Sequence, residues 1–226
     1  MRVSGLLAFR RFWQSDRGLA AFLVIIVVTA FVLPPLVSPG RLARLAFGIL
    51  FSLLLVTGTA SVIAGRTTRV VLTGVAIVAI ALQALDQAFP SPGLDRAGAL
   101  AAVTSAGLLA LVVLVQAFRA GPVTMHRIEG AIAAYLLLGI TWASAYHFMR
   151  LLDPGAFTGA GMGAGTGAAS FMYFSFVTLT TVGYGDVTPV HEVARSLAIL
   201  EALTGQLYPA ILLARLVSLE VVDRQR

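Results

Sequence analysis

The sequence predicts an all-α integral membrane protein with six transmembrane helices. Hydrophobic residues make up 58% of the chain and charged residues only 12%, whereas about a quarter of the residues of a soluble domain are charged. The mean hydropathy is +0.92. The apolar residues fall into runs close to the ~20 residues that a helix needs to cross a bilayer.

The six predicted spans are bounded by residues that interrupt helices. Pro34-Pro35 and Ser38-Pro39-Gly40 end the first span, and proline and glycine clusters or short arginine-containing segments separate the others. The spans are 19–36, 42–64, 70–89, 97–118, 128–151 and 191–219.

Arginine placement predicts the orientation in the membrane. All 16 basic residues are arginine, and with the N-terminus inside, eleven of them lie on the inner side and five on the outer side. Because positive residues are enriched in cytoplasmic loops, both termini are predicted to be cytoplasmic. The net charge of +6 is therefore interpreted as a signal of topology and of anionic lipid headgroups rather than of nucleic acid. The chain has no cysteine, which excludes disulfides and thiolate metal sites.

The most informative stretch lies between the last two spans. Residues 180–186 read Thr-Thr-Val-Gly-Tyr-Gly-Asp. Glycine adopts backbone conformations that other residues avoid, so the alternation of glycine with Val182 and Tyr184 lets successive carbonyls point the same way. Several such loops around one axis would stack rings of carbonyl oxygen, each able to replace the water shell of a cation. The hydroxyl of Thr181 would add one more ring.

This stretch resembles the selectivity filter of potassium channels. The match covers the string from Thr181 to Gly185, and the longer segment 178–186 is similar to the pore loop of that family. The resemblance, which covers roughly the last hundred residues, implies that K⁺ binds at Thr181, Val182, Gly183 and Tyr184, that Gly185 completes the filter, and that Asp186 shapes the outer mouth. One filter per chain implies a homotetramer, with K⁺ as the permeant ion and no cofactor.

The predicted spans, together with the resemblance in the last hundred residues, divide the chain into five parts. Residues 1–18 would be a cytoplasmic N-terminus, 19–118 a four-helix transmembrane domain of unknown role, 119–127 a cytoplasmic linker, 128–219 the pore domain, and 220–226 a cytoplasmic tail. Within the pore domain, the outer helix is predicted at 128–151, a re-entrant pore helix at 170–180, the filter at 181–185 and the inner helix at 191–219. The glycine-rich stretch 153–168 is predicted to form a mobile extracellular turret.

Several residues are expected to support the filter. They are Tyr173, Phe174, Val177, Thr180 and Glu201. In the family, a tryptophan usually occupies the position of Phe174; since phenylalanine donates no hydrogen bond, Tyr173 is the alternative donor. Some relatives have a carboxylate at the position of Val177, so Asp186 either finds other partners here or stays in water. Glu201 either lines the cavity or bonds behind the filter to Ser175, Thr178 or Thr204.

The inner helix contains the gating candidates. Gly205 weakens the helix, and Pro209 removes a backbone hydrogen bond to it. They mark either a gating hinge or a static kink. Leu212, Leu216 and Leu219 share one helical face, which either closes a hydrophobic constriction or faces lipid. His126 and His191 lie at helix ends, where they are either pH sensors or ordinary interfacial residues.

The front half gives no sign of a voltage sensor. Residues 97–116 contain no arginine or lysine, although voltage gating needs several charges inside the membrane field. The sequence therefore predicts a potassium-selective channel of the plasma membrane, gated by inner-helix bending or at the filter, and not an enzyme. The alternatives are a weakly selective cation channel, a K⁺ transporter, which would need four pore loops in one chain, and a sensory membrane protein with a vestigial pore.

Overall fold

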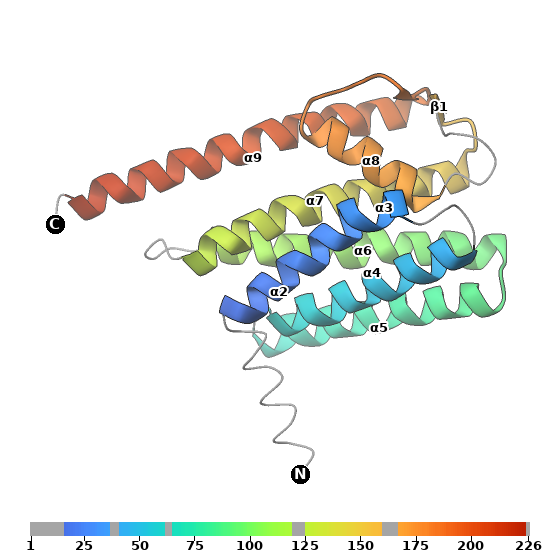
Figure 1. Ribbon diagram of the computed structural model, residues 1–226, viewed down its shortest axis with the longest axis horizontal. Coiled ribbons are helices and arrows are strands. Elements are labelled where there is room, and N and C mark those ends of the chain that lie inside the picture. The colour runs from blue at the N-terminus through green and yellow to red at the C-terminus, as the bar shows by residue number, and fades with distance from the viewer. Residues whose placement is uncertain (1–15, 37–40, 62–64, 119–124, 160–166, 225–226) are drawn as a thin grey trace, which may run out of the picture.

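The computed structural model describes residues 16–36, 41–61, 65–118, 125–159 and 167–224. Nearly all of them are helical (Figure 1). The long helices are α4 (Arg41–Ser61), α5 (Arg66–Ala88), α6 (Pro92–Ala117), α7 (Met125–Leu152) and α9 (Glu192–Arg224). Two short strands, β1 (Phe157–Gly159) and β2 (Val187–Pro189), pair antiparallel.

The first predicted span is three consecutive helical segments. They are α2 (Asp16–Val27), the π-helix η1 (Val28–Val32) and α3 (Leu33–Leu36). Pro34 and Pro35 lie in α3, and the helix continues to Leu36, the last residue of the predicted span. In the π-helical turn before them, the N–H of Leu33 donates to the carbonyl of Val28, five residues back.

Helices α2, α4, α5, α6 and α7 form a closed circuit in which each contacts its neighbours (Figure 1). Fully buried side chains such as Phe22, Leu54 and Leu109 fill its interior. Gly58 lets α4 approach closely, since a Cβ there would lie 2.5 Å from Leu109 and 3.0 Å from Phe22. Small residues at helix contacts are typical of membrane bundles, where close van der Waals packing drives association.

The described residues contain four helices that are long and apolar enough to cross a membrane. They are Arg66–Ala88, Pro92–Ala117, Arg127–Leu152 and Glu192–Arg215. The first two predicted spans contain shorter apolar stretches, Gly18–Val32 and Leu45–Ser61. The protein is thus a mostly helical, multi-pass membrane protein, and the count of six spans stays a prediction.

Several predicted boundaries shift by a few residues. Helix α6 begins at Pro92 rather than at 97, because the Ser91 hydroxyl accepts a hydrogen bond from the amide of Leu94 and Pro92 occupies the first turn. Helix α9 continues to Arg224, through most of the predicted tail 220–226. The segments 37–40, 62–64 and 119–124, which include most of the predicted linker, lie outside the described residues.

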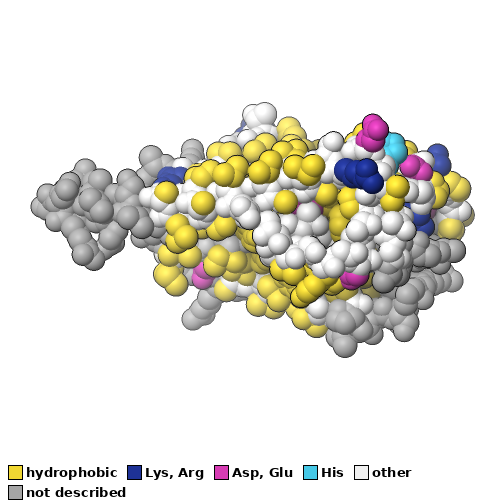
Figure 2. Space-filling view, turned by 90° about the horizontal axis from the view of Figure 1, so that it is seen from above, with side chains coloured by type: hydrophobic (Ala, Val, Ile, Leu, Met, Phe, Trp, Pro, Cys, Tyr) yellow, Lys and Arg dark blue, Asp and Glu magenta, His cyan; other side chains and the backbone are white. Residues whose placement is uncertain are grey.

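Helices α8 (Ala168–Leu179) and α9 pack on one side of this circuit (Figure 1). Figure 2 shows hydrophobic side chains along this face, with the charged residues gathered toward one end of the molecule. On α9 the exposed apolar side chains include Ile199, Leu203 and Leu207, each more than half exposed. An apolar face of this extent is what contact with lipid or with other chains requires.

Candidate functional site

The predicted filter follows the C-terminal end of α8 directly, and backbone hydrogen bonds attach its first residues to that end of the helix. The amide of Thr181 donates to the carbonyl of Thr178 at 2.9 Å. The amides of Val182 and Gly183 both donate to the carbonyl of Val177, at 3.0 and 3.2 Å. Val177 therefore contacts the filter through its backbone. Thr180 is the C-cap residue of α8, and its hydroxyl donates to the carbonyl of Phe176.

The backbone of the loop alternates in handedness. Thr181, Gly183 and Gly185 have φ values of 59°, 57° and 78°, whereas Val182 and Tyr184 between them do not have positive φ. Such alternation is the pattern that aligned carbonyls require. A positive φ is unusual for a β-branched residue such as Thr181, and this strain is of the kind that concentrates at functional sites.

The loop is open to its surroundings in the single chain. Every residue from Thr180 to Asp186 is exposed, including Val182 at 53% and Tyr184 at 70%. Exposed Val182 and Tyr184 leave apolar surface that a single chain does not cover. The loop thus has the surface expected of a segment that other chains complete.

Asp186 at the end of the loop has a side-chain partner. The hydroxyl of Tyr173 donates to Asp186 Oδ2 at 2.7 Å, and the amide of Val187 donates to Oδ1 at 3.1 Å. The hydrogen bond to this carboxylate raises the pKa of Tyr173, so the phenol keeps its proton at neutral pH. Tyr173 is the donor considered in place of Phe174, and its bond goes to Asp186.

Phe174 is buried in an aromatic cluster behind the loop. Its ring lies 5.0 Å from that of Tyr146 and 5.6 Å from that of Phe157, both nearly edge-on. Phe171 joins the cluster through Phe157 at 5.1 Å. Phe176 points elsewhere and contacts Phe31 of η1, with ring centroids 4.6 Å apart.

The strand pair after the filter was missed by the sequence analysis. The stretch 153–168 was predicted as a mobile turret, but residues 157–159 form β1, and Gly159 pairs with Val187 directly after the filter. Gly159 has a φ of 125°, and a Cβ there would lie 2.0 Å from the carbonyl oxygen of Asp186. Strand β1 has only three residues and lies next to glycine-rich sequence, so it is too short to show the alternation of apolar and polar residues that predicts a strand. Residues 160–166 lie outside the described part.

Glu201 lies behind the loop and is fully buried. Its Oε1 is 2.6 Å from Ser175 Oγ of α8, and its Oε2 is 2.6 Å from the Tyr146 hydroxyl of α7. Of the three partners predicted for a bonding role, the structure selects Ser175, since the Thr204 hydroxyl bonds its own helix at the carbonyl of Leu200. Tyr146 was not predicted; within an apolar helix it has no sequence signal that separates it from a core aromatic.

Comparison with known proteins agrees with this geometry. Residues 134–221 match the ion channel family. "Two pore potassium channel c" of Oryza sativa subsp. japonica is 39% identical over 92 residues, which are 41% of this chain and 18% of the relative. Residues 134–221 of this chain are thus similar to ion channels, and one of the relatives is a potassium channel by its printed name.

Two further relatives are similar to part of the chain. "Protein LctB" of Bacillus caldotenax is 37% identical over 87 residues, 37% of this chain and 64% of the relative. "Protein LctB" of Geobacillus stearothermophilus is 52% identical over 46 residues, 20% of this chain and 34% of the relative. The chain thus spans less than two thirds of each of these three relatives. No solved structure matches it significantly. The matched segment, residues 134–221, is of an ion channel type and not of an enzyme type.

In this channel domain, Gly205 lies at a helix contact. A Cβ at Gly205 would lie 1.7 Å from the carbonyl oxygen of Leu179, the last residue of α8. Pro209 lies inside the continuous helix α9, so the carbonyl of Gly205 lacks its usual helical donor. The predicted hinge position is therefore also the place where the inner helix touches the base of the filter loop.

The other gating and pH-sensing candidates are less distinctive. Leu212 is half-buried against the chain's own core, and the side chains of Leu216, Leu219 and His126 lie outside the described part. His191 Nδ1 accepts a hydrogen bond from the amide of Val193 at the start of α9. An additional contact, which the sequence did not suggest, joins Gln206 Nε2 to the Thr181 hydroxyl at 3.5 Å.

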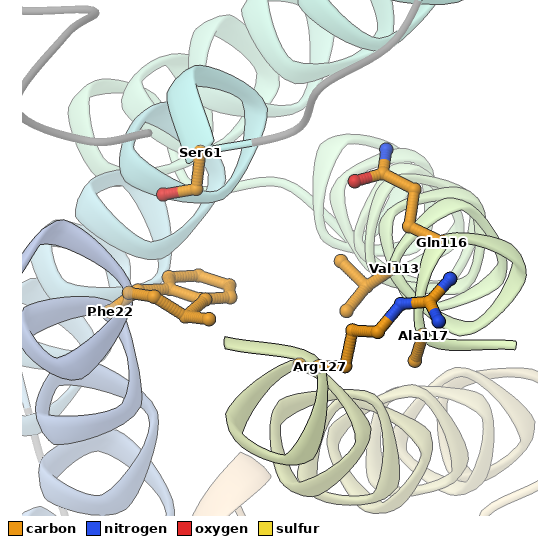
Figure 3. A pocket seen from close by; sticks show the side chains of 8 residues that line it. Phe22, Ser61, Val113, Gln116, Ala117 and Arg127 are labelled. Atoms are coloured by element: carbon orange, nitrogen blue, oxygen red, sulfur yellow. The ribbon is translucent and has the colours of Figure 1, made fainter. Parts of the chain in front are cut away.

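A small cavity lies away from the filter, among α2, α4, α6 and α7 (Figure 3). Its volume is about 60 Å³, and its lining includes Phe22, Val113, Gln116 and Arg127. This space has room for only a few water molecules and is too small for a drug-sized ligand. The channel-type loop, not this cavity, is the candidate functional site.

Proposed function

We propose that this protein is a potassium-selective channel in which four identical chains surround one pore. The observation that carries the proposal is the exposed loop from Thr181 to Gly185, whose φ values alternate in sign. Four such loops around an axis would form rings of oxygen from Thr181, Val182, Gly183 and Tyr184 that replace the hydration shell of K⁺. Because one chain supplies one loop, a closed ring requires a homotetramer.

The length of α8 supports a re-entrant position. Its 12 residues rise about 18 Å, which is too short for a hydrocarbon core of ~30 Å. A helix of this length enters the membrane and ends inside it, where the negative end of its dipole favours a cation. The loop at Thr181 then continues toward the outer mouth at Asp186.

The location of the protein, its permeant ion and its gating follow from this arrangement. The protein resides in the plasma membrane with both termini in the cytoplasm, and lipid covers the apolar outer faces. K⁺ is the permeant ion, and conduction requires no cofactor. Gating occurs at the filter or through the α9 segment around Gly205 and Pro209, since the fourth span has no charges to act as a voltage sensor.

The relatives favour potassium over other cations. One of them has a printed name that identifies it as a potassium channel, and Tyr184 is retained at the filter position where weakly selective channels commonly differ. A weakly selective cation channel and a vestigial pore in a sensory protein remain as outcomes of the test.

Cation flux from liposomes tests the proposal. Purified protein is reconstituted, and K⁺ efflux is measured with and without Na⁺ as the competing ion. We expect K⁺-selective flux that Ba²⁺ blocks and that Gly183→Ala abolishes. Equal flux of both ions would identify a non-selective channel. Absence of flux across a range of pH and voltage, with the tetramer intact, would support a vestigial pore.

A further inference from the structure

Glu201 is a buried carboxyl group in the middle of α9. It is 0% exposed and lies in the membrane-crossing segment Glu192–Arg215. An isolated carboxylate in such surroundings is costly unless a cation or several donors compensate it. The charge state of Glu201 therefore depends on what surrounds it.

Three short oxygen–oxygen contacts connect Glu201 of α9 with α8 and α7, two of them made by Glu201 itself. Tyr146 Oη is 2.6 Å from Glu201 Oε2, and Ser175 Oγ is 2.6 Å from Glu201 Oε1. Ser175 Oγ is also 2.7 Å from the carbonyl oxygen of Gly139 in α7. Each contact is at hydrogen-bond distance, and each needs one proton between its two oxygens.

The hydroxyl groups supply only two of these three protons. Tyr146 has one proton and Ser175 has one, while the carbonyl of Gly139 and an ionised carboxylate have none. The proton of Ser175 serves either Glu201 or Gly139, but not both. A third proton on Glu201 Oε1 satisfies every contact, because Glu201 then donates to Ser175, and Ser175 donates to Gly139.

The neighbouring groups give no reason for a charge on Glu201. Within the described chain, the titratable side chains that face it are the phenols of Tyr146 and Tyr135 on α7, and phenols are neutral at physiological pH. Helix α8 contributes the hydroxyl of Ser175. These partners are all uncharged, and a neutral acid matches them.

We propose that Glu201 is a neutral carboxylic acid whose proton completes a hydrogen-bonded chain from α9 through Ser175 to the backbone of α7. The chain fixes α8 between the two helices, directly behind the filter loop, and Glu201 is thus a positioning residue. Its protonation does not depend on the proposed function, whereas its effect on the filter rests on that function.

Infrared spectroscopy of the protein in lipid tests the protonation directly. The difference spectrum between wild type and Glu201→Gln should contain the carbonyl stretch of a protonated carboxyl group at neutral pH. The matched control is Glu192→Gln, since Glu192 is an exposed residue in the first turn of α9, and its difference spectrum should contain carboxylate bands only. Carboxylate bands alone for Glu201→Gln would overturn the proposal.

A second variant keeps the test independent of how well Glu201→Gln folds. Ser175→Ala removes the acceptor of the acid proton and should shift the protonated carboxyl stretch to higher frequency. An unchanged band position would show that Glu201 does not donate to Ser175, which contradicts the proposal.

Thermal unfolding tests whether the hydrogen bonds of Glu201 hold the helices in position. Glutamine keeps a donor toward Ser175 and an acceptor toward Tyr146, so Glu201→Gln should retain the unfolding midpoint of the wild type, whereas Glu201→Ala should lower it. Equal losses for both variants would contradict the neutral acid. Neither the infrared measurement nor the unfolding measurement requires ion flux. The protonation of Glu201 can therefore be established or refuted even if the protein proves not to be a channel.

Discussion

Gly205 of α9 lies against the carbonyl group of Leu179 at the end of α8, so closely that a Cβ on the glycine would be 1.7 Å from that oxygen. The hydroxyl of Tyr135 approaches the same oxygen at 3.5 Å. The inner helix and the base of the filter loop are thus joined at a backbone-to-backbone contact. We therefore expect a movement of α9 at this level to displace the C-terminus of α8.

We expect Gly205→Ala to destabilise the protein and reduce flux. Alanine cannot fit without separating α9 from α8, and overpacking of this kind costs about 1–3 kcal/mol. The measurement is the thermal midpoint of purified protein together with K⁺ flux. Gly74→Ala is the matched control, because nothing lies within 4 Å of a Cβ at helical Gly74. If the two variants behaved alike, the close contact would have no energetic role.

The helical class and the alternating backbone of the loop 181–185 could be predicted because both depend on local signals. Apolar runs identify membrane helices through length alone, and the alternation of glycine with larger residues in 181–185 determines the backbone of the loop. Thr181 has a positive φ like Gly183 and Gly185, although a threonine in the sequence does not by itself predict a positive φ.

The missed features depend on contacts between distant segments. The bond between Glu201 and Tyr146 joins residues 55 positions apart, and the pairing of Gly159 with Val187 connects segments that lack a strand pattern. Gly205 was interpreted through its flexibility, yet its lack of a side chain matters equally, because that is what permits the contact with Leu179. Sequence patterns report propensity, whereas these roles depend on tertiary proximity.

Tyr173→Phe should destabilise the outer end of the filter. The variant removes the hydrogen bond to Asp186, and we expect faster decay of current during sustained opening. The effect should be much smaller in an Asp186→Asn background, where the charged acceptor is already absent. A Tyr173→Phe effect that is equally large in both backgrounds would contradict a direct link between these residues.

The same bond predicts a dependence on alkaline pH. The pKa of Tyr173 is raised above its ordinary value of about 10, so the contribution of this bond is fully present below pH ~10 and is lost as the pH rises through the raised value. Current decay in the wild type should therefore approach that of Tyr173→Phe at strongly alkaline pH, while the variant itself changes less. Parallel changes in both proteins would exclude Tyr173 as the titrating group.

Phe31→Ala tests whether the front half supports the filter helix. Phe31 of η1 packs against Phe176 of α8, with ring centroids 4.6 Å apart. The Phe176 ring is also close to α7, since a Cβ on Gly139 would lie 2.6 Å from it. Aromatic pairs contribute about 0.5–1.5 kcal/mol beyond their burial. A double-mutant cycle with Phe176→Ala, measured by thermal unfolding, should recover a coupling in that range. Phe89→Ala, at an exposed ring, is the control, and zero coupling between Phe31 and Phe176 would refute the support role.

Gly159→Ala should disturb the outer mouth of the pore. Alanine at a φ of 125° is strained, and its Cβ would overlap the carbonyl oxygen of Asp186. We expect loss of stability and altered Ba²⁺ block. The control is Gly167→Ala, because a Cβ at Gly167 has no neighbour within 4 Å. Normal stability and block in Gly159→Ala would show that the strand pair does not hold the filter.

Selection of potassium by the loop from Thr181 to Gly185 is tested by the reversal potential of current through purified protein. The protein is placed in a planar bilayer with K⁺ on one side and an equal concentration of Na⁺ on the other. We predict a reversal potential displaced far toward the potential that opposes K⁺ flow, and loss of current with Gly183→Ala. A reversal potential near zero from the wild-type protein would contradict potassium selectivity.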